Sequence, residues 1–149
     1  MKQENRSRTL SWIVLAAAGI AVMGIGSYFI LLRPPLLPED LRFLALPASQ
    51  LDIVRPRLEL WLAHVFLVLG GYAVATGVLT VALAATSFRA HSRGAAIGAT
   101  IGGAASIGLM AAVNFAIASD FKWVLLGIAL LWLCSLVLFW VETRNGRPD

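Results

Sequence analysis

The side chains that could do chemistry are few, and most of them stand inside long apolar stretches. His64, Tyr72 and Asn114 have apolar sequence on both sides, and Glu59 directly precedes the stretch that holds His64. An ionisable side chain inside a membrane-spanning stretch marks a candidate functional site, because burying it in lipid is costly. We therefore expect these residues to line a cavity that opens toward the outer face, with Glu59 at its mouth. Such a cavity would bind an apolar or amphipathic small molecule.

The same polar side chains also have a structural interpretation. Lipid offers no hydrogen-bond partners, so polar groups on neighbouring helices bond one another and gain about 0.6–2 kcal/mol per bond. In an antiparallel pair of helices, His64 lies level with Asn114 and Tyr72 lies level with Ser106. The pattern favours such bonds over a binding site, but it does not decide between them.

Several chemistries that use small membrane scaffolds lack their necessary residues in this chain. A bis-histidine haem needs two histidines within the membrane, whereas His91 stands in a predicted loop and only His64 is in an apolar stretch. Cys134 has no second cysteine with which to oxidise. The apolar stretches contain no carboxylate for proton-coupled transport. We expect no metal and no cofactor, and an enzyme with His64 as base would lack an orienting carboxylate or a nucleophile.

Four stretches without Asp, Glu, Lys or Arg must position these residues. They run for 24, 29, 26 and 19 residues between the flanking charges, whereas about 20 helical residues cross a hydrocarbon core of roughly 30 Å. With 59% hydrophobic residues, the chain has little polar material for a separate soluble unit. We predict an all-α integral membrane protein with one membrane domain, residues 1–149, built as an antiparallel bundle of four transmembrane helices. The predicted spans are about 10–32, 60–86, 94–118 and 123–141.

The connection over residues 33–59 is longer than the others and rich in proline. Arg33-Pro34-Pro35 ends the first span, because proline removes a backbone donor and disfavours helix in the preceding residue. Pro38-Glu39-Asp40 predicts the start of a short amphipathic helix, closed by Pro47, which lies on the outer leaflet. Ser49 to Asp52 has the pattern of a capping box that starts the helix leading into the second span. The amphipathic helix either covers one end of the bundle or docks a partner or lipid.

The third predicted span carries a ridge of small side chains. Gly94, Gly98, Gly102 and Ser106 follow one another at intervals of four residues. Such ridges let helices approach closely in lipid. We predict that this ridge packs against the preceding span at the centre of the bundle, with a contact between two copies of the chain as the alternative.

Charge placement predicts the orientation. If the N-terminus is cytoplasmic, the inner segments hold seven Lys or Arg in 23 residues and the outer segments hold five in 31. Positive charge collects on the cytoplasmic side, so we expect both termini there and a multi-pass protein of the cell membrane. The net charge of +4 is spread over these segments and does not indicate nucleic-acid binding.

Two functions remain open at this stage. The first is assembly: a small non-enzymatic membrane protein that acts as an accessory subunit or homo-oligomer, with the lipid bilayer and another membrane protein as partners. The second is a carrier or binding protein for an apolar or amphipathic small molecule that enters beside His64. The biochemical function itself does not follow from the sequence.

Overall fold

The structure is a computed structural model that describes residues 10–45 and 47–145, and all the regular elements in these ranges are helical. The prediction of an all-α protein is confirmed. Two π-helical turns (η) also occur, one at the end of a long helix and one within another. In chain order the elements are α2 (Leu10–Leu31), α3 (Pro38–Leu44), α4 (Ala48–Leu83), η1 (Ala84–Phe88), α5 (Arg93–Gly103), η2 (Ala104–Gly108), α6 (Leu109–Ala116) and α7 (Lys122–Asn145).

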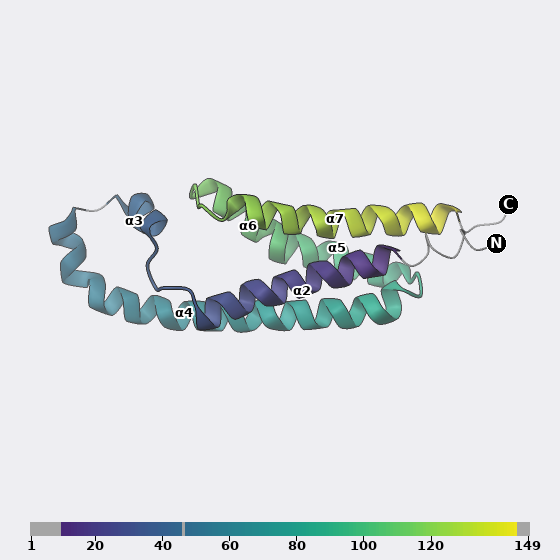
Figure 1. The fold of residues 1–149 in the computed structure, drawn as a ribbon, viewed down its shortest axis with the longest axis horizontal. Coiled ribbons are helices and arrows are strands. Elements are labelled where there is room, and N and C mark those ends of the chain that lie inside the picture. The colour runs from purple at the N-terminus through teal and green to yellow at the C-terminus, as the bar shows by residue number, and fades with distance from the viewer. Residues whose placement is uncertain (1–9, 46, 146–149) are drawn as a thin grey trace.

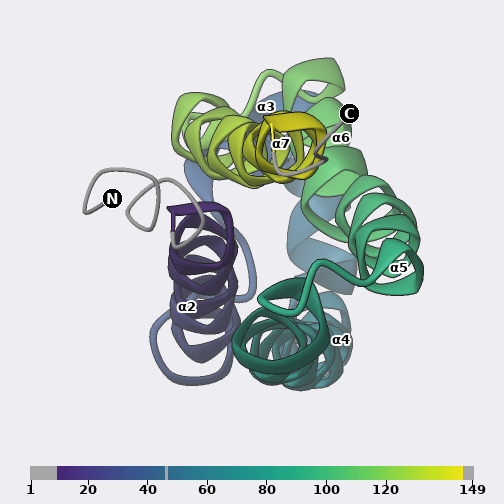
Figure 2. The ribbon, with the colours of Figure 1, turned by 90° about the vertical axis from the view of Figure 1, so that its right-hand side faces the viewer.

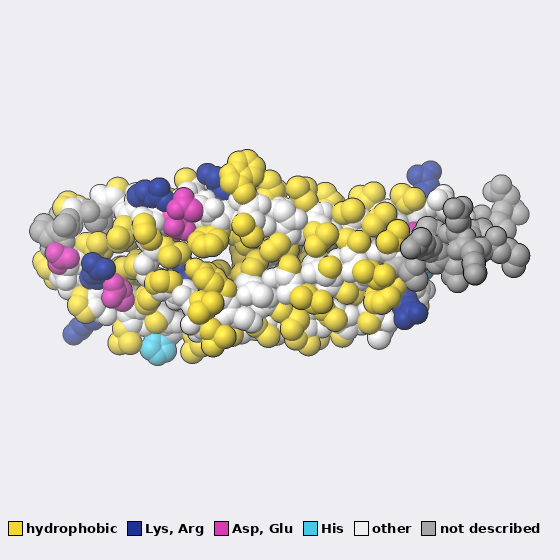
Figure 3. Space-filling model, viewed as in Figure 1, with side chains coloured by type: hydrophobic (Ala, Val, Ile, Leu, Met, Phe, Trp, Pro, Cys, Tyr) yellow, Lys and Arg dark blue, Asp and Glu magenta, His cyan; other side chains and the backbone are white. Residues whose placement is uncertain are grey.

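Four helices are long and apolar enough to cross a membrane, as the charge-free stretches predicted. They are Leu10–Leu31, Leu51–Phe88, Arg93–Ala116 and Lys122–Asn145. Large apolar side chains cover their outer surfaces, and Figure 3 shows these across the middle of the molecule, with charged side chains gathered toward the two ends. A water-soluble protein rarely exposes so large an apolar area. The composition of the surface is therefore that of a multi-pass membrane protein.

The long helices lie side by side along the length of the molecule (Figure 1). Viewed from one end, α2 lies between α4 and α7, and α5 and α6 lie beside α7 on its other side (Figure 2). α2 packs along both of its neighbours, whereas α4 makes little contact with α5 or α6 among the described residues. The ring of helices is therefore packed on three sides and loosely joined on the fourth.

The closest helix contact is between α2 and α4, and it depends on four glycines. A Cβ atom on Gly70 would lie 2.7 Å from the carbonyl oxygen of Gly26, and a Cβ on Gly77 would lie 2.5 Å from that of Gly19. Real Cβ atoms do not approach backbone so closely, so only glycine fits at these positions. The two glycines on each helix are seven positions apart, which is about two helical turns. This α2–α4 seam lets the two backbones gain van der Waals contact where lipid gives no hydrophobic drive.

The predicted ridge on the third span does not pack as we expected. A Cβ on Gly98 or Gly102 would meet nothing within 4 Å, and one on Gly94 would meet only the Ser92 hydroxyl. The prediction that these residues pack against the preceding span is therefore wrong within the described chain. Ser106, the last member of the ridge, lies farther along in η2.

The packed face of α5 consists of the residues that directly follow the members of the predicted ridge. Ala95, Ala99 and Gly103 are buried, and the Trp132 ring of α7 covers Gly103 so closely that a Cβ there would collide with it. The indole Nε1 of Trp132 donates a hydrogen bond of 2.9 Å to the carbonyl oxygen of Ala99. α5 therefore packs on α7 rather than on α4, and it does so with the face that holds Ala95, Ala99 and Gly103.

Several hydroxyl side chains on the second and third spans bond within their own helix. The hydroxyls of Thr76, Thr80, Thr100 and Ser106 each donate to the carbonyl oxygen four residues earlier. Such bonds satisfy a hydroxyl in lipid without a second helix. The expected hydrogen bonds between these two helices are therefore absent from the described residues.

The connection between α2 and α4 partly follows its prediction. α3 begins at Pro38 as expected, but it ends at Leu44, because Ala45 adopts a left-handed conformation with φ 49°. Leu46 and the side chain of Ser49 lie outside the described residues, so the proposed capping box is not described. α4 continues through Pro56, and its first turns bend toward α3 (Figure 1). Proline explains a bend there, since its ring displaces the preceding turn.

The end of the bundle opposite α3 is closely packed; we call it the Glu142 end. Phe88 and Phe139 are fully buried there, with ring centroids 4.6 Å apart. Glu142 is 7% exposed and accepts hydrogen bonds from both the backbone N–H and the hydroxyl of Ser11. The His91 ring stacks on Phe139, and its Nε2 lies 3.4 Å from the Glu142 carboxylate. This carboxylate joins the start of α2 to the end of α7.

Candidate ligand-binding site

A cavity of about 570 Å³ lies in the half of the bundle next to α3. Its wall comes from α2, α3, α4, η2, α6 and α7, together with the segments that join α2 to α3 and α6 to α7. Among the described residues α4 packs mainly on α2 and α6 packs on α7, and the cavity lies where α4 and α6 make little contact with each other. Cavities of roughly 300–1,000 Å³ are the size that small molecules and cofactors occupy in proteins.

The deeper wall of the cavity is apolar. It includes aliphatic side chains from every surrounding helix: Val22, Ile25, Leu69, Ile107, Leu109, Met110, Val113 and Leu125. Part of it is the π-helical turn η2, which contributes Ala105, Ser106 and Ile107. A π-helical turn inserts one extra residue into a helix, and such turns are frequent at functional sites. This wall suits a hydrocarbon body rather than a polar ligand.

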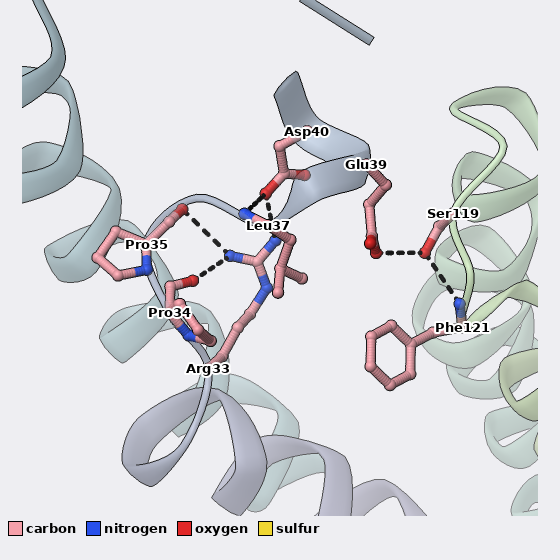
Figure 4. A network of polar contacts seen from close by, with 8 residues as sticks. All are labelled: Arg33, Pro34, Pro35, Leu37, Glu39, Asp40, Ser119 and Phe121. Atoms are coloured by element: carbon pink, nitrogen blue, oxygen red, sulfur yellow. Dashed lines mark hydrogen bonds and ion pairs between the residues drawn. The ribbon is translucent and has the colours of Figure 1, made fainter. Parts of the chain in front are cut away.

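The end of the cavity nearest α3 is polar and charged. Arg33 follows the last residues of α2, and its guanidinium lies 3.1 Å from the Asp40 carboxylate of α3. It also donates to the carbonyl oxygens of Pro34 and Pro35 (Figure 4). The guanidinium plane lies over the Phe66 ring, with its central carbon 3.5 Å from the ring centroid. Arg33 is therefore a neutralised and fixed part of the wall.

Asp40 serves two structural purposes at the same place. The oxygen that pairs with Arg33 also accepts a hydrogen bond of 2.8 Å from the backbone N–H of Leu37. This N–H stands before the first turn of α3, so the Asp40 side chain caps the helix. The prediction that Pro38-Glu39-Asp40 begins a helix is borne out by this geometry.

Glu39, one residue earlier, points toward the α6–α7 connection instead. It is 6% exposed, and one of its carboxylate oxygens accepts a hydrogen bond of 3.2 Å from the Ser119 hydroxyl (Figure 4). Ser119 is itself 2% exposed and accepts a bond from the backbone N–H of Phe121. Glu39, Ser119 and Phe121 all line the cavity. The site therefore contains a buried carboxylate with no cation within 4 Å among the described side chains.

The structure brings together only part of the predicted site. Tyr72 and Asn114 both line the cavity, and Ser106 does so as well. Asn114 donates to the carbonyl oxygen of Met110 on its own helix. His64 does not line the cavity; it is exposed on α4 and its Nδ1 lies 2.7 Å from the carbonyl oxygen of Leu60. The expected approach of His64 to Asn114 is therefore not found.

Glu59 also lies away from the cavity. Its carboxylate pairs with Arg55 one helical turn earlier, at 2.8 Å, and both side chains are well exposed. The predicted mouth at Glu59 is thus wrong, and the charged residues at the cavity are Arg33, Glu39 and Asp40. The sequence signal for them was the Arg33-Pro34-Pro35 break followed by acidic residues, which turns the chain back over the end of the helices.

The described residues contain no group of three or more His, Cys, Asp or Glu side chains that could hold a metal ion. The lone thiol, Cys134, is exposed on α7. The polar chemistry at the cavity therefore consists of one carboxylate, one neutralised ion pair, and hydroxyl and amide groups. Such a set can bind and orient a ligand by charge and hydrogen bonding.

Comparison with known proteins adds no template for this site. No protein-family model, curated protein or solved structure matches the chain. The chemistry of the cavity must therefore be argued from its own residues.

Proposed function

We propose that this chain is an integral membrane protein whose four long helices form an antiparallel bundle, with α3 lying at the outer interface. The charge count supports this orientation: seven Lys or Arg in 23 residues on the inner side and five in 31 on the outer side. Both termini are then cytoplasmic, in the cell membrane. The cavity faces the outer leaflet, and the Glu142 end faces the cytoplasm.

The proposed function is to bind an amphipathic small molecule or lipid within the membrane. The observation that carries this proposal is the cavity of about 570 Å³, which has an apolar wall and a charged end. An amphipathic ligand in a bilayer places its headgroup near the interface and its hydrocarbon deeper, and the cavity has the same polarity gradient. Because α4 and α6 are in little contact among the described residues, such a molecule would enter from the lipid between them.

Filling the cavity tests this function. Ala104 and Ala105 are both exposed residues of η2, but Ala105 lines the cavity and Ala104 does not. We expect Ala105→Phe to displace the ligand and Ala104→Phe to leave it bound. Native mass spectrometry of the purified protein, with identification of the extracted molecules, measures both. If the wild type carries no bound molecule, or if Ala105→Phe retains it as the wild type does, the proposal fails.

A second candidate function is assembly with another membrane protein or a second copy of the chain. The open space beside Gly98 and Gly102 supports it, because small residues facing lipid can admit another helix. Gly98→Leu should then abolish a defined oligomer or complex. Gly127→Leu is the matched control, since a Cβ at Gly127 also meets nothing within 4 Å. Single-molecule photobleaching in nanodiscs gives the oligomeric state, and a monomer that purifies alone from native membranes contradicts this function.

A further inference from the structure

The buried carboxylate of Glu39 points to the chemical class of the ligand. We infer that the cavity binds a molecule with an ammonium group on an apolar body, an inference that rests on the proposed function. The ammonium group would lie beside Glu39, Ser119 and Phe121, and the hydrocarbon would extend toward η2. The argument depends on which charges at this end of the cavity are already paired.

The charged side chains around the site can be paired one by one. Arg33 is bound to Asp40 at 3.1 Å. Arg42, one turn after Glu39 in α3, is bound to Asp120 at 3.1 Å, with both side chains exposed. Lys122 begins α7 nearby, but it neither lines the cavity nor lies within ion-pair distance of Glu39 in the described part of the chain. Among the described carboxylates that line the cavity, Glu39 is therefore the one without a cation at ion-pair distance.

This situation is costly unless something else supplies the positive charge. A carboxylate taken out of water needs a cation or several hydrogen bonds to offset its lost hydration. Glu39 is 6% exposed and receives a single hydrogen bond, from a neutral hydroxyl. Its second oxygen has no hydrogen-bond donor among residues 10–45 and 51–145, and it is not fully enclosed by protein, so a molecule in the cavity can reach it. A ligand that carries a positive charge beside this carboxylate would supply what is missing.

The remaining groups at this end favour a cation over an anion. The Arg33 guanidinium already donates to Asp40, Pro34 and Pro35, so few of its donors remain for an anionic headgroup. Two aromatic rings, Tyr28 and Phe121, lie 5.8 Å apart and both line the cavity. Aromatic faces attract ammonium groups, including quaternary ones, through their negative π-clouds. The headgroup site is therefore acidic and aromatic.

Three probes of equal chain length test the inference: dodecyltrimethylammonium, dodecanol and laurate. Each probe is titrated into the full-length protein in dodecylmaltoside micelles, and native mass spectrometry gives the number of probe molecules bound per protein. We expect dodecyltrimethylammonium to bind about tenfold more tightly than dodecanol, because its charge is attracted by the Glu39 carboxylate and the aromatic rings, and laurate to bind most weakly. Equal affinity for the three probes, or tighter binding of laurate, overturns the inference.

A matched pair of variants assigns the selectivity to Glu39. Glu39→Gln keeps an oxygen for the Ser119 hydroxyl and removes the charge, so the advantage of dodecyltrimethylammonium over dodecanol should disappear. Glu59→Gln removes a carboxylate that is exposed and away from the cavity, and should leave the advantage unchanged. Loss of the advantage in both variants, or in neither, contradicts the role of Glu39. If Glu39→Gln does not fold, the three-probe series on the wild type still decides the inference.

The same experiments separate this inference from the proposed function. If all three probes bind equally and Ala105→Phe displaces them, the cavity binds amphipathic molecules but the ammonium preference is refuted. If no probe binds, the proposed function fails as well. Nanodiscs of phosphatidylethanolamine and of phosphatidylglycerol identify the source of the ammonium. Retention of phosphatidylethanolamine that depends on Glu39 indicates a bilayer lipid, whereas selective binding of dodecyltrimethylammonium alone indicates a free amphipathic amine.

Discussion

The two ends of the bundle each bury one glutamate, but they satisfy it differently. Glu142 accepts two hydrogen bonds from Ser11 and lies 3.4 Å from the His91 ring. Glu39 accepts a single bond from Ser119 and faces a cavity. The exposed fractions are nearly equal, 7% and 6%. The difference lies in the partners: the chain itself satisfies the first carboxylate, which fastens two helices, and leaves the second able to bind something else.

The packing around the two glutamates differs in the same way. At the Glu142 end, Phe88 and Phe139 fill the space between the helices. At the α3 end, α4 and α6 are separated by the cavity. A close-packed core stabilises the fold, while an unfilled one gives up dispersion contacts that a ligand can restore. This contrast predicts that substitutions at the Glu142 end and in the α2–α4 seam reduce the free energy of unfolding, whereas substitutions at Glu39 change ligand binding.

The largest loss of stability is expected from Gly77→Ala in the α2–α4 seam. The added methyl group would lie 2.5 Å from the carbonyl oxygen of Gly19 and 2.8 Å from the backbone nitrogen of Met23, so the two helices must separate. Such overpacking costs about 1–3 kcal/mol. The control is Gly71→Ala on the same helix, where the new Cβ would meet nothing within 4 Å. SDS-induced unfolding in mixed micelles measures both; equal stability of the two variants would mean that the seam is not a close contact.

Glu142→Gln should cost somewhat less. The two oxygens of Glu142 each accept a bond from Ser11, and an amide has only one oxygen to offer. Leaving one buried donor without an acceptor reduces the free energy of unfolding by about 1–2 kcal/mol. Glu59→Gln, which removes an exposed pair within one helix, should change it by less than about 0.5 kcal/mol. If both substitutions have the same small effect, the Glu142 carboxylate does not stabilise the contact between α2 and α7 as its hydrogen bonds indicate.

Trp132→Phe tests the boundary between the two halves, where α7 packs on α5 just before η2. Phenylalanine keeps most of the ring over Gly103 but cannot donate to the carbonyl oxygen of Ala99. We expect a loss of about 1 kcal/mol, the usual net value of one hydrogen bond. Trp123→Phe on the same helix is the control, because that indole is 66% exposed. A loss of the same size in the control would assign the effect to general ring size rather than to this bond.

The sequence predicted the helices well because the signal for a membrane span is local. A charge-free stretch can be recognised from its own residues, without knowing which helices pack against it. The first helix accordingly ends at Leu31 and the last begins at Lys122, each within a residue or two of the predicted bound. The packed faces could not be predicted in this way. α5 is rich in Gly and Ala on every side, so spacing alone did not separate Gly94, Gly98 and Gly102 from the adjacent face that packs on Trp132.

The site was only half predictable for the same physical reason. Tyr72 and Asn114 were found because polar residues are conspicuous in apolar sequence. His64 met the same criterion but turns outward, since a helix of many turns presents each residue to a different side. Arg33 and Glu39 reach the cavity because the chain folds back over the helix ends after two prolines. That reversal is a tertiary feature with no period in the sequence.

The smallest change in stability is expected from Glu39→Gln, and it is the change that most sharpens the comparison. In the protein without ligand, the substitution keeps an acceptor for Ser119 and removes a buried charge that has no cation partner among the described side chains. Replacing such a charge with a neutral group is commonly neutral or stabilising. We therefore expect the free energy of unfolding to stay within about 0.5 kcal/mol of the wild type or to rise, measured in the same mixed micelles. Glu142→Gln is its counterpart, because that residue is equally buried but fully bonded. A loss above about 1 kcal/mol in Glu39→Gln would show that the chain does use this carboxylate to hold its fold, and the two ends would then differ in packing but not in the purpose of their glutamates.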